Sequence, residues 1–333
     1  MKSVTIQDVA NEAQVSIATV SRVLSGKGQV SAERRNRVLE AADRLDYTTD
    51  LKVRAPRKVE ARILLMIVPR ISNPFYAEIV HGFQNTAYKN GYEVMLCQSM
   101  SNPRRLEEYI ELMRSGVAEG AVTLDPMTGL DVFATLVGKF PLVQCCEYNE
   151  ALSSSYVAVD NVRAAREVVH FLHSIGCRRI ALLNSGLNFK YARDRQQGYE
   201  EGLQELGLPV RPEGIAHVSD VNFNLALGVA ERLLGGTPPP DAVFAVSDVY
   251  AAAVEKAAKR MGIRVPQDLA VVGFDNIDVS LMCDPSITTV NQPRYEIGAF
   301  ACDMLLERIR TPETPVRQLI LNTELIVRDS TLR

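Results

Sequence analysis

The sequence predicts an α/β protein with an N-terminal helix-turn-helix head and a two-lobed body of doubly wound parallel sheets. Three observations support this prediction. The chain has 333 residues, which is more than one hydrophobic core usually organises. Residues 1–47 fit three short amphipathic helices. From residue 61 onward, short apolar runs alternate twice with helical periods, and a basic and polar stretch, residues 48–60, separates the two patterns.

Composition predicts an ordinary globular chain. Hydrophobic residues make up 47% and charged residues 23%, which argues against disorder and against a membrane protein. The longest strongly apolar stretch, residues 63–68, is far shorter than the roughly 20 residues of a membrane span. The first ten residues lack the pattern of a secretion leader, so we expect a cytoplasmic protein with no membrane partner. The six cysteines show no C-x-x-C spacing, so we expect reduced thiols.

Each of the three head helices has a start signal. Thr5 and Asp8 form a plausible capping box for the first helix. Ser16 can cap the second, which ends before Gly26, and Ser31 can cap the third. At helical spacing, the inward-facing positions are Ile6, Val9, Ala10, Ala13, Val20, Val23, Leu24, Val38, Ala41, Ala42 and Leu45.

Two short helices joined by a tight turn form the arrangement that places the second, recognition helix in the DNA major groove. The outer face of that helix carries Ile17, Ala18, Thr19, Ser21 and Arg22. Residues 1–60 hold 11 Lys and Arg against 8 Asp and Glu, and residues 61–333 hold 26 against 32, so a basic head precedes an acidic body. The pattern leaves one alternative open, a three-helix cap with solvated arginines that binds no DNA.

The body is expected to fold as parallel sheets that are buried on both faces. Continuous apolar runs bounded by Gly, Pro and Asn indicate such strands at residues 62–68, 93–97, 120–124, 141–145, 180–184, 241–246 and 269–274. Predicted helices lie between them, among others at residues 75–89, 161–175, 191–206 and 248–261. The alternation occurs twice, which is consistent with two lobes that face one cleft.

Doubly wound sheets bind ligands beyond the carboxyl ends of their strands. The residues at those positions are polar or aromatic: Asn73, Phe75, Tyr76, Asp125, Glu147, Tyr191, Arg195, Phe223, Ser247, Asp248, Asp275 and Asn276. Aromatic faces stack on a flat or apolar ring surface, and Arg195 and Asp275 can each hold vicinal hydroxyls, so a sugar or a nucleoside is indicated. Structural roles stay open, since Asp248 can cap a helix and Arg195 can pair with Asp275.

The chain also carries a family resemblance. VTIQDVANEAQVSIATVSRVLSGKGQVSAERRNRVLEAADRLDY resembles the headpiece of the LacI/GalR family of transcription regulators. The resemblance continues through PFYAEIVHGF, RRIALLN, DRQQGY, PPPDAVFAVSD, GIRVPQDLAVVGFDNID and ITTVNQPRYEIG, and so covers nearly the whole chain. It implies a DNA-binding transcription repressor controlled by a small-molecule effector, with a periplasmic-binding-protein-like body. The implied N-terminal lobe is residues 61–160 with 291–326, and the C-terminal lobe is residues 161–290.

The resemblance implies which residues contact DNA. Ile17, Ala18 and Arg22 occupy base-reading positions, and of these only Arg22 can make a bidentate contact to guanine. Contacts to phosphates or the groove wall are implied for Ser16, Thr19, Ser21, Ser25, Ser31 and Arg34, with Arg54 added from the linker. Because one head can make only a few direct contacts to bases, we expect two heads to bind one palindromic double-stranded site. Only seven residues follow Ile326, too few for the leucine-heptad helix of tetrameric members, so a homodimer is expected.

The linker departs from the family pattern. Family members usually fold it into a hinge helix on DNA, with a leucine that wedges into the minor groove. Here Arg54, Ala55 and Pro56 stand where Arg-Ser-Leu is customary, so the wedge and a backbone donor are missing. We hypothesise weakened coupling between hinge and DNA, in which case Pro56→Leu raises operator affinity; an unchanged or weaker complex would count against the hypothesis. A flexible tether is the alternative.

The resemblance further implies an effector cleft lined by Phe75, Tyr76, Asp125, Glu147, Tyr191, Arg195, Phe223, Ser247 and Asp275. Residues 272–298, together with Glu147, are most similar to a cytidine-responsive branch of the family. A nucleoside is therefore the first expectation for the effector, and a sugar is the second.

Two other classes of protein share such a body. An α/β enzyme is disfavoured, because the sequence has no GxGxxG after a strand, no GxxxxGK[ST] loop and no GxSxG. His170 and His173 lack the glutamate of an HExxH zinc motif, so neither a metal nor another cofactor is expected. A transport-type solute-binding protein would need a secretion signal and would not need a helix-turn-helix head.

Overall fold

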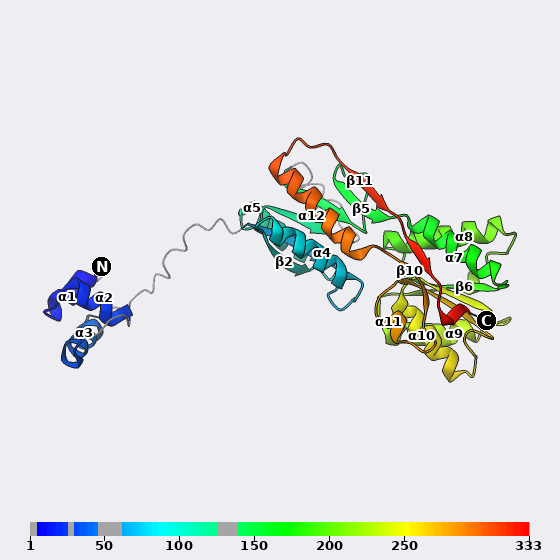
Figure 1. Cartoon of the computed structure of the whole chain (residues 1–333), viewed down its shortest axis with the longest axis horizontal. Helices are drawn as coiled ribbons and strands as arrows, with labels where there is room; N and C mark the ends of the chain where they lie inside the picture. The colour runs from blue at the N-terminus through cyan, green and yellow to red at the C-terminus, as the bar shows by residue number, and fades with distance from the viewer. Residues whose placement is uncertain (1–4, 26–29, 46–61, 126–138, 333) are drawn as a thin grey trace. The chain divides into compact units, whose positions relative to one another are not determined.

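The computed structural model describes residues 5–25, 30–45, 62–125 and 139–332. The chain divides into two compact units, Met1–Glu60 and Ala61–Arg333, which we call the head and the body. Figure 1 shows the helices of the head and the two sheets of the body. Arg54, Pro56 and the remainder of the predicted linker lie outside the described residues.

The head consists of α1 (Ile6–Glu12), α2 (Ile17–Ser25) and α3 (Ala32–Arg44). The predicted capping box is present, because Thr5 Oγ1 accepts from the Asp8 amide and Asp8 Oδ2 accepts from the Thr5 amide at 2.8 Å. Ser16 Oγ accepts from the Thr19 amide at 3.3 Å and so caps α2. Ser31 occupies the N-cap position of α3, but its side chain makes no capping hydrogen bond, in contrast to the prediction.

One apolar cluster holds the three head helices together. Its buried members are Val9, Ala10, Ala13, Val20, Val23, Val38, Ala41 and Ala42. They are positions that helical spacing assigns to the inner face. Because α2 buries only this stripe, its opposite stripe faces solvent.

The first sheet of the body has the strand order β11-β5-β4-β3-β1-β2 and is parallel throughout. Its strands are β1 (Ile63–Val68), β2 (Glu93–Gln98), β3 (Gly120–Thr123), β4 (Leu142–Cys145), β5 (Ser155–Val159) and β11 (Gln318–Leu321). Its helices are α4 (Tyr76–Lys89), α5 (Pro103–Arg114) and α12 (Arg294–Arg310). Apolar side chains of α4 and α12 form one core with the sheet, and those of α5 form another.

The second sheet has the order β12-β10-β9-β8-β6-β7 and is parallel except for β12. Its strands are β6 (Ile180–Ser185), β7 (Ile215–Val218), β8 (Ala242–Ala245), β9 (Ala270–Asp275), β10 (Thr288–Asn291) and β12 (Glu324–Ile326). Its helices are α7 (Asn161–Ser174), α8 (Lys190–Glu205), α9 (Phe223–Leu234), α10 (Asp248–Arg260) and α11 (Val279–Met282). Two doubly wound sheets are thus confirmed. No helix within the described residues is long and apolar enough to span a membrane.

The C-terminal strands differ from the predicted lobe boundary. The sequence places residues 291–326 in the first lobe, and α12 and β11 do pack there. β12 instead pairs antiparallel with β10, with Leu325 opposite Val290, so residues 324–326 belong to the second sheet. This pairing covers the N–H and C=O groups along one edge of β10. The chain therefore passes between the lobes three times, after β5, after β10 and after β11.

α4 and α12 cross at two glycines. A Cβ atom at Gly82 would meet the carbonyl oxygen of Tyr295, and a Cβ atom at Gly298 would meet the carbonyl oxygen of Ile79. Each glycine therefore lets the backbone of the partner helix approach closely. This contact fixes α12 on the first lobe, directly after the chain returns from β10.

Candidate functional site

The outer face of α2 carries the residues predicted to read DNA bases. Ser16, Ile17, Ala18, Ser21 and Arg22 are exposed, and Ile17 has 43% of its surface accessible although it is a large apolar residue. Thr19 is half-buried and its hydroxyl is 2.9 Å from that of Ser16. An exposed helix face with a guanidinium, an isoleucine and small hydroxyl groups suits the major groove, where these groups can contact guanine, a thymine methyl and phosphates.

The neighbouring helix α3 exposes a basic face. Arg34, Arg35 and Arg37 are exposed and form no ion pair among the described residues, whereas Arg44 lies 3.6 Å from Glu12. Unpaired guanidinium groups are available to phosphates. Ser31 is also exposed at the start of α3. The side chain of Ser25 and all of Arg54 lie outside the described residues.

A cavity lies in the body where the carboxyl ends of the two sheets meet. It encloses about 510 Å³, open solvent at its mouth included. Its lining residues are Asn73, Phe75, Tyr76, Leu124, Cys146, Glu147 and Val159 from the first lobe, and Asn161, Tyr191, Arg195, Val221, Val246, Ser247, Asp275 and Gln292 from the second lobe and its crossovers. Ligands of doubly wound sheets bind at this edge.

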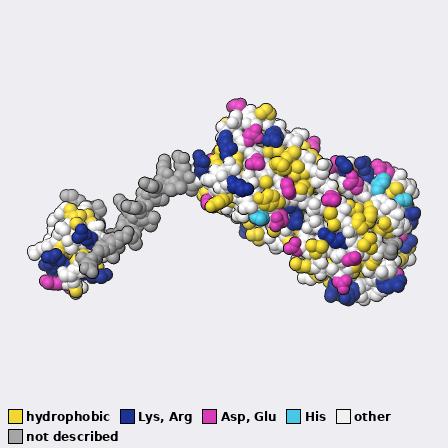
Figure 2. All heavy atoms as spheres, in the orientation of Figure 1, with side chains coloured by type: hydrophobic (Ala, Val, Ile, Leu, Met, Phe, Trp, Pro, Cys, Tyr) yellow, Lys and Arg dark blue, Asp and Glu magenta, His cyan; other side chains and the backbone are white. Residues whose placement is uncertain are grey.

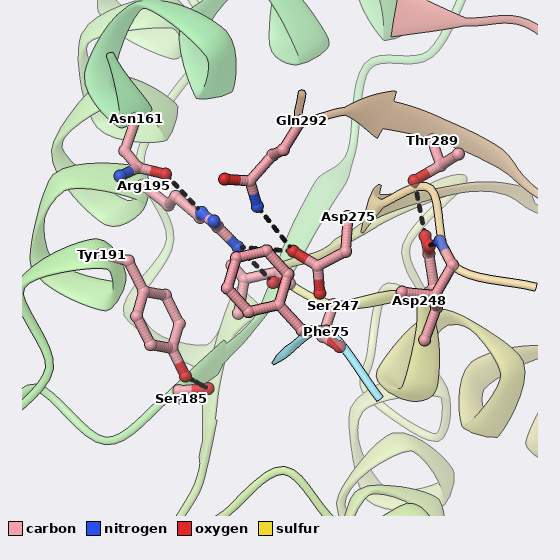
Figure 3. A network of polar contacts seen from close by, with 12 residues as sticks. Phe75, Asn161, Ser185, Tyr191, Arg195, Ser247, Asp248, Asp275, Thr289 and Gln292 are labelled. Carbon is pink, nitrogen blue, oxygen red and sulfur yellow. Dashed lines mark hydrogen bonds and ion pairs between the residues drawn. The ribbon is translucent and has the colours of Figure 1, made fainter. Parts of the chain in front are cut away.

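Arg195 lines this cavity, and several contacts fix its orientation (Figure 3). It is 4% exposed, its Nε donates to Asn161 Oδ1 at 2.9 Å, and its Nη1 donates to the Val246 carbonyl at 2.6 Å. The guanidinium stacks 3.5 Å from the ring centroid of Phe274. Burial lowers the pKa of Arg195, and the carboxylate of Asp275 opposes this effect.

Asp275 lies beside this guanidinium. Its Oδ1 is 3.8 Å from Arg195 Nη1 and accepts from Gln292 Nε2 at 2.8 Å. Burial raises the pKa of Asp275 to about 6, although the charge of Arg195 lowers it in part. Asp275 has a left-handed φ of 110°, so the backbone at the end of β9 is held in an uncommon conformation that aims this carboxylate. The pair offers donors and acceptors side by side.

Glu147 links the lobes. It follows β4, yet its carboxylate accepts from the Lys190 amide at 2.7 Å and from the Tyr191 amide at 3.0 Å, at the N-terminus of α8. Phe189, the N-cap residue of α8, makes no side-chain capping bond, so a residue of the opposite lobe supplies the cap. Burial raises the pKa of Glu147 to about 7, and the two backbone bonds oppose the rise. Both carboxylate oxygens are therefore engaged.

A second chamber adjoins the first. It encloses about 640 Å³ with its mouth included, shares Asn73, Tyr76, Tyr191 and Val221 with the first cavity, and adds among others Phe189. An ion pair between Arg70 Nε and Asp220 Oδ2, 2.9 Å apart, joins the two lobes at its wall. The cleft is thus bridged between the lobes by polar contacts at Glu147 and at Arg70.

Seven of the nine residues predicted for the effector cleft line the first cavity: Phe75, Tyr76, Glu147, Tyr191, Arg195, Ser247 and Asp275. Asp125 and Phe223 do not. Asp125 is fully buried and accepts a hydrogen bond from the Ser99 hydroxyl, while its neighbour Leu124 faces the cavity, because consecutive residues of extended chain face opposite ways. Phe223 begins α9 and is 38% exposed, and Val221 takes the cavity position instead.

Sequence reasoning missed two polar residues of the cavity. Asn161 begins α7 just beyond β5, and Gln292 directly follows β10. Both stand after a strand, so the rule that found the others applies to them. It failed here because the sequence reading identified neither β5 nor β10 as a strand.

Both the head and the body match models of known protein families. Residues 5–50 match the model of the bacterial regulatory proteins of the lacI family, and residues 169–331 match that of the periplasmic binding protein-like domain. The HTH-type transcriptional repressor CytR of Escherichia coli (strain K12) is 36% identical over 328 residues, which are 98% of this chain and 96% of CytR. The chain belongs to the LacI family.

Other LacI-family proteins extend the likeness. The ribose operon repressor of Halalkalibacterium halodurans is 34% identical over 98% of this chain and 97% of its own length. The solved structure of the transcriptional regulator CelR with cellobiose matches with a TM-score of 0.73 and 29% identity, covering 98% of this chain and all of CelR. As a LacI-family member, this chain is a DNA-binding transcriptional repressor with an effector-binding body, and not an enzyme.

Proposed function

We propose that this LacI-family repressor binds a palindromic operator as a homodimer in the cytoplasm, and that an uncharged nucleoside or sugar in the interlobe cleft changes its operator affinity. The observation that supports this proposal most is the buried pair of Arg195 and Asp275, which lines a cavity together with aromatic side chains. A guanidinium and a carboxylate side by side can bind vicinal hydroxyl groups with several hydrogen bonds.

The charges of the cavity favour an uncharged effector over a phosphorylated one. Arg195 is its only lining cation among the described residues, whereas Glu147 and Asp275 contribute two carboxyl groups. Arg195 is already paired with Asp275, so a phosphate would enter without an unpaired cation to meet it. Tyr76, whose hydroxyl has no hydrogen-bond partner among the described residues, can serve a neutral polar group.

Two adjoining chambers favour a nucleoside within this class. Ribose hydroxyls would bind at Arg195 and Asp275, and a flat base would extend past Tyr76 toward Phe189 in the second chamber. The similarity to a cytidine-responsive branch of the family points the same way. The ribose operon repressor and the CelR–cellobiose complex among the relatives support the sugar alternative.

Exposed apolar side chains support the homodimer. Leu281 and Met282 on α11 are 63% and 77% exposed, and Met95 is exposed on the edge strand β2. A second copy of the chain would cover these residues. It would also supply a second head, which is needed because Ile17, Ala18 and Arg22 of one head can make only a few base contacts.

Calorimetric titration of the full chain with cytidine, cytidine monophosphate, ribose and cellobiose tests the proposal. We expect cytidine to bind, the phosphorylated form to bind at least about tenfold more weakly, and Asp275→Asn to remove binding of the preferred ligand. Asp303→Asn, on an exposed position of α12, is the matched control and should leave the affinity unchanged. Tighter binding of the monophosphate, or full binding by Asp275→Asn, would refute the assignment.

A further inference from the structure

A third cavity of the body lies at the opposite edge of the second sheet from the effector cleft. Its lining includes Ile180 and Ala181, the first two residues of β6, whereas the cleft lies beyond the carboxyl ends of the strands. Leu203 and Leu233, near the ends of α8 and α9, add apolar surface. It encloses about 760 Å³, open solvent at its mouth included. This size is typical of small-molecule sites.

Positive charge is concentrated around this cavity. Arg178, Arg179, Arg211 and Arg232 line it, against the single acidic residue Glu213. The body as a whole has the opposite sign, since residues 61–333 hold 26 Lys and Arg against 32 Asp and Glu. On the face of the body seen in Figure 2, side chains of both signs are interspersed. Four arginines on one concave surface therefore depart from the surrounding charge pattern.

The hydrogen bonds of these arginines leave most of their charge unneutralised. Arg178 Nη1 donates to the carbonyls of His173 at 3.0 Å and Cys177 at 2.8 Å, and Arg232 Nη1 donates to the Gly228 carbonyl at 3.1 Å. Bonds to neutral carbonyls orient a guanidinium and leave its charge in place.

The two remaining arginines of this cavity, Arg211 and Arg179, differ in their interaction partners. The side chain of Arg211 has no hydrogen-bond or ion-pair partner among the described residues, although its carbonyl accepts from the Gly214 amide at 2.9 Å. Arg179 differs, because its Nη1 lies 3.7 Å from Asp241 Oδ2. Three of the four guanidinium groups thus face no carboxylate within ion-pair distance in the described part of the chain.

We propose that this cavity binds a phosphomonoester whose organic part is apolar or aromatic. A phosphate dianion matches several guanidinium groups, each of which can donate two parallel hydrogen bonds to it. Ile180, Leu203 and Leu233 would cover the organic part and remove it from water. The site is separate from the effector cleft, so it does not depend on the function proposed for that cleft.

Calorimetric titration of the full chain with phenyl phosphate, inorganic phosphate and phenol tests this inference. Phenyl phosphate should bind more tightly than either of its parts. The double variant Arg211→Ala with Arg232→Ala should bind phenyl phosphate at least about tenfold more weakly than the wild type does. Arg211→Ala alone, which removes no side-chain hydrogen bond or ion pair within the described residues, should also weaken phenyl phosphate binding.

Two controls make the result decisive. Arg104→Ala with Arg114→Ala removes the same charge from exposed positions of α5 in the other lobe and should leave phenyl phosphate binding unchanged. Asp275→Asn should also leave it unchanged, because it alters only the effector cleft. The inference is overturned if phenyl phosphate does not bind at millimolar concentrations, if the Arg211 variants bind it as the wild type does, or if the α5 variant weakens it equally.

Discussion

The carboxyl group of Glu255 on α10 is buried, and its Oε1 has no hydrogen-bond partner among the described residues. Burial raises the pKa of Glu255 to about 8, well above the ordinary value of 4.5. Between these two values the folded chain holds the proton and the unfolded chain does not, so stability falls as pH rises through this range. The sign is the reverse of that for a carboxylate held by an ion pair.

Glu255→Gln removes this titration. We expect the melting temperature of the variant to exceed that of the wild type at about pH 8.5 and the advantage to shrink at about pH 5, with a shift of about 2–4 °C for each kcal/mol. Thermal unfolding of both proteins, followed by circular dichroism across this pH range, measures the difference in melting temperature. Glu108→Gln, at an exposed position of α5, is the control and should show no such trend. An equal gain at both pH values would contradict the account.

At the residue scale, the sequence predicted most of the cleft, because most cleft residues come after a strand with a continuous apolar run. Asn161 and Gln292 were missed because they follow β5 and β10, which the sequence did not identify as strands. Asp275 is the last residue of β9, and Arg195 lies on α8, the helix that follows β6. Asp125 shows the limit of the rule, since a strand end fixes the neighbourhood of a residue while the alternation of side chains decides which of two neighbours faces the cavity. The capping of α8 by Glu147 joins residues that are 43 and 44 positions apart, and no local pattern predicts such a contact.

Among the elements, the crossing of α4 and α12 depends on Gly298. Gly298→Ala places a Cβ against the Ile79 carbonyl, so the helices must move apart, and we expect a loss of about 1–3 kcal/mol in the free energy of unfolding. Gly228→Ala on α9 is the matched control, because nothing lies within 4 Å of its Cβ, and it should be neutral or stabilising by about 0.5–1 kcal/mol. Denaturant unfolding of both variants measures the difference, and equal effects would contradict the close contact.

The N-terminus of α8 depends on a residue of the other lobe. Glu147→Ala removes the acceptor of the Lys190 and Tyr191 amides, so these amides should exchange hydrogen faster with solvent. Hydrogen exchange of the peptide that begins α8 measures the change. Glu150→Ala, at an exposed position nearby in sequence, should leave the exchange as it is. Unchanged protection in the Glu147 variant would contradict the capping of α8 by Glu147.

Most strands with continuous apolar runs were predictable, and so was the edge strand β2, whereas the edge strands β7, β11 and β12 were not. β1, β3, β4, β8 and β9 are almost wholly buried, so their sequences read as strands. β7 and β11 lie at sheet edges and are only partly buried, so they lack such runs. β12 has three residues and pairs antiparallel with β10, a partner that only the tertiary fold provides.

At the scale of the whole molecule, the proposed regulation requires linkage between the head and the body. An effector that binds one arrangement of the lobes more tightly shifts the population of chains that bind DNA, and a coupling of about 1–3 kcal/mol corresponds to about 5- to 150-fold in operator affinity. Arg22→Ala should abolish discrimination between operator and random DNA while leaving effector binding intact, because Arg22 belongs to the head and the cleft to the body. Loss of effector binding in that variant would contradict separate units.

The most direct test is the fluorescence anisotropy of a duplex enriched by site selection, titrated with the full chain with and without the cleft ligand. The account predicts preference for that duplex over random DNA, a change of about 5- to 150-fold when ligand is added, and no change on addition of ligand in Asp275→Ala. Absence of any duplex preference, or a ligand response that survives in Asp275→Ala, would contradict it.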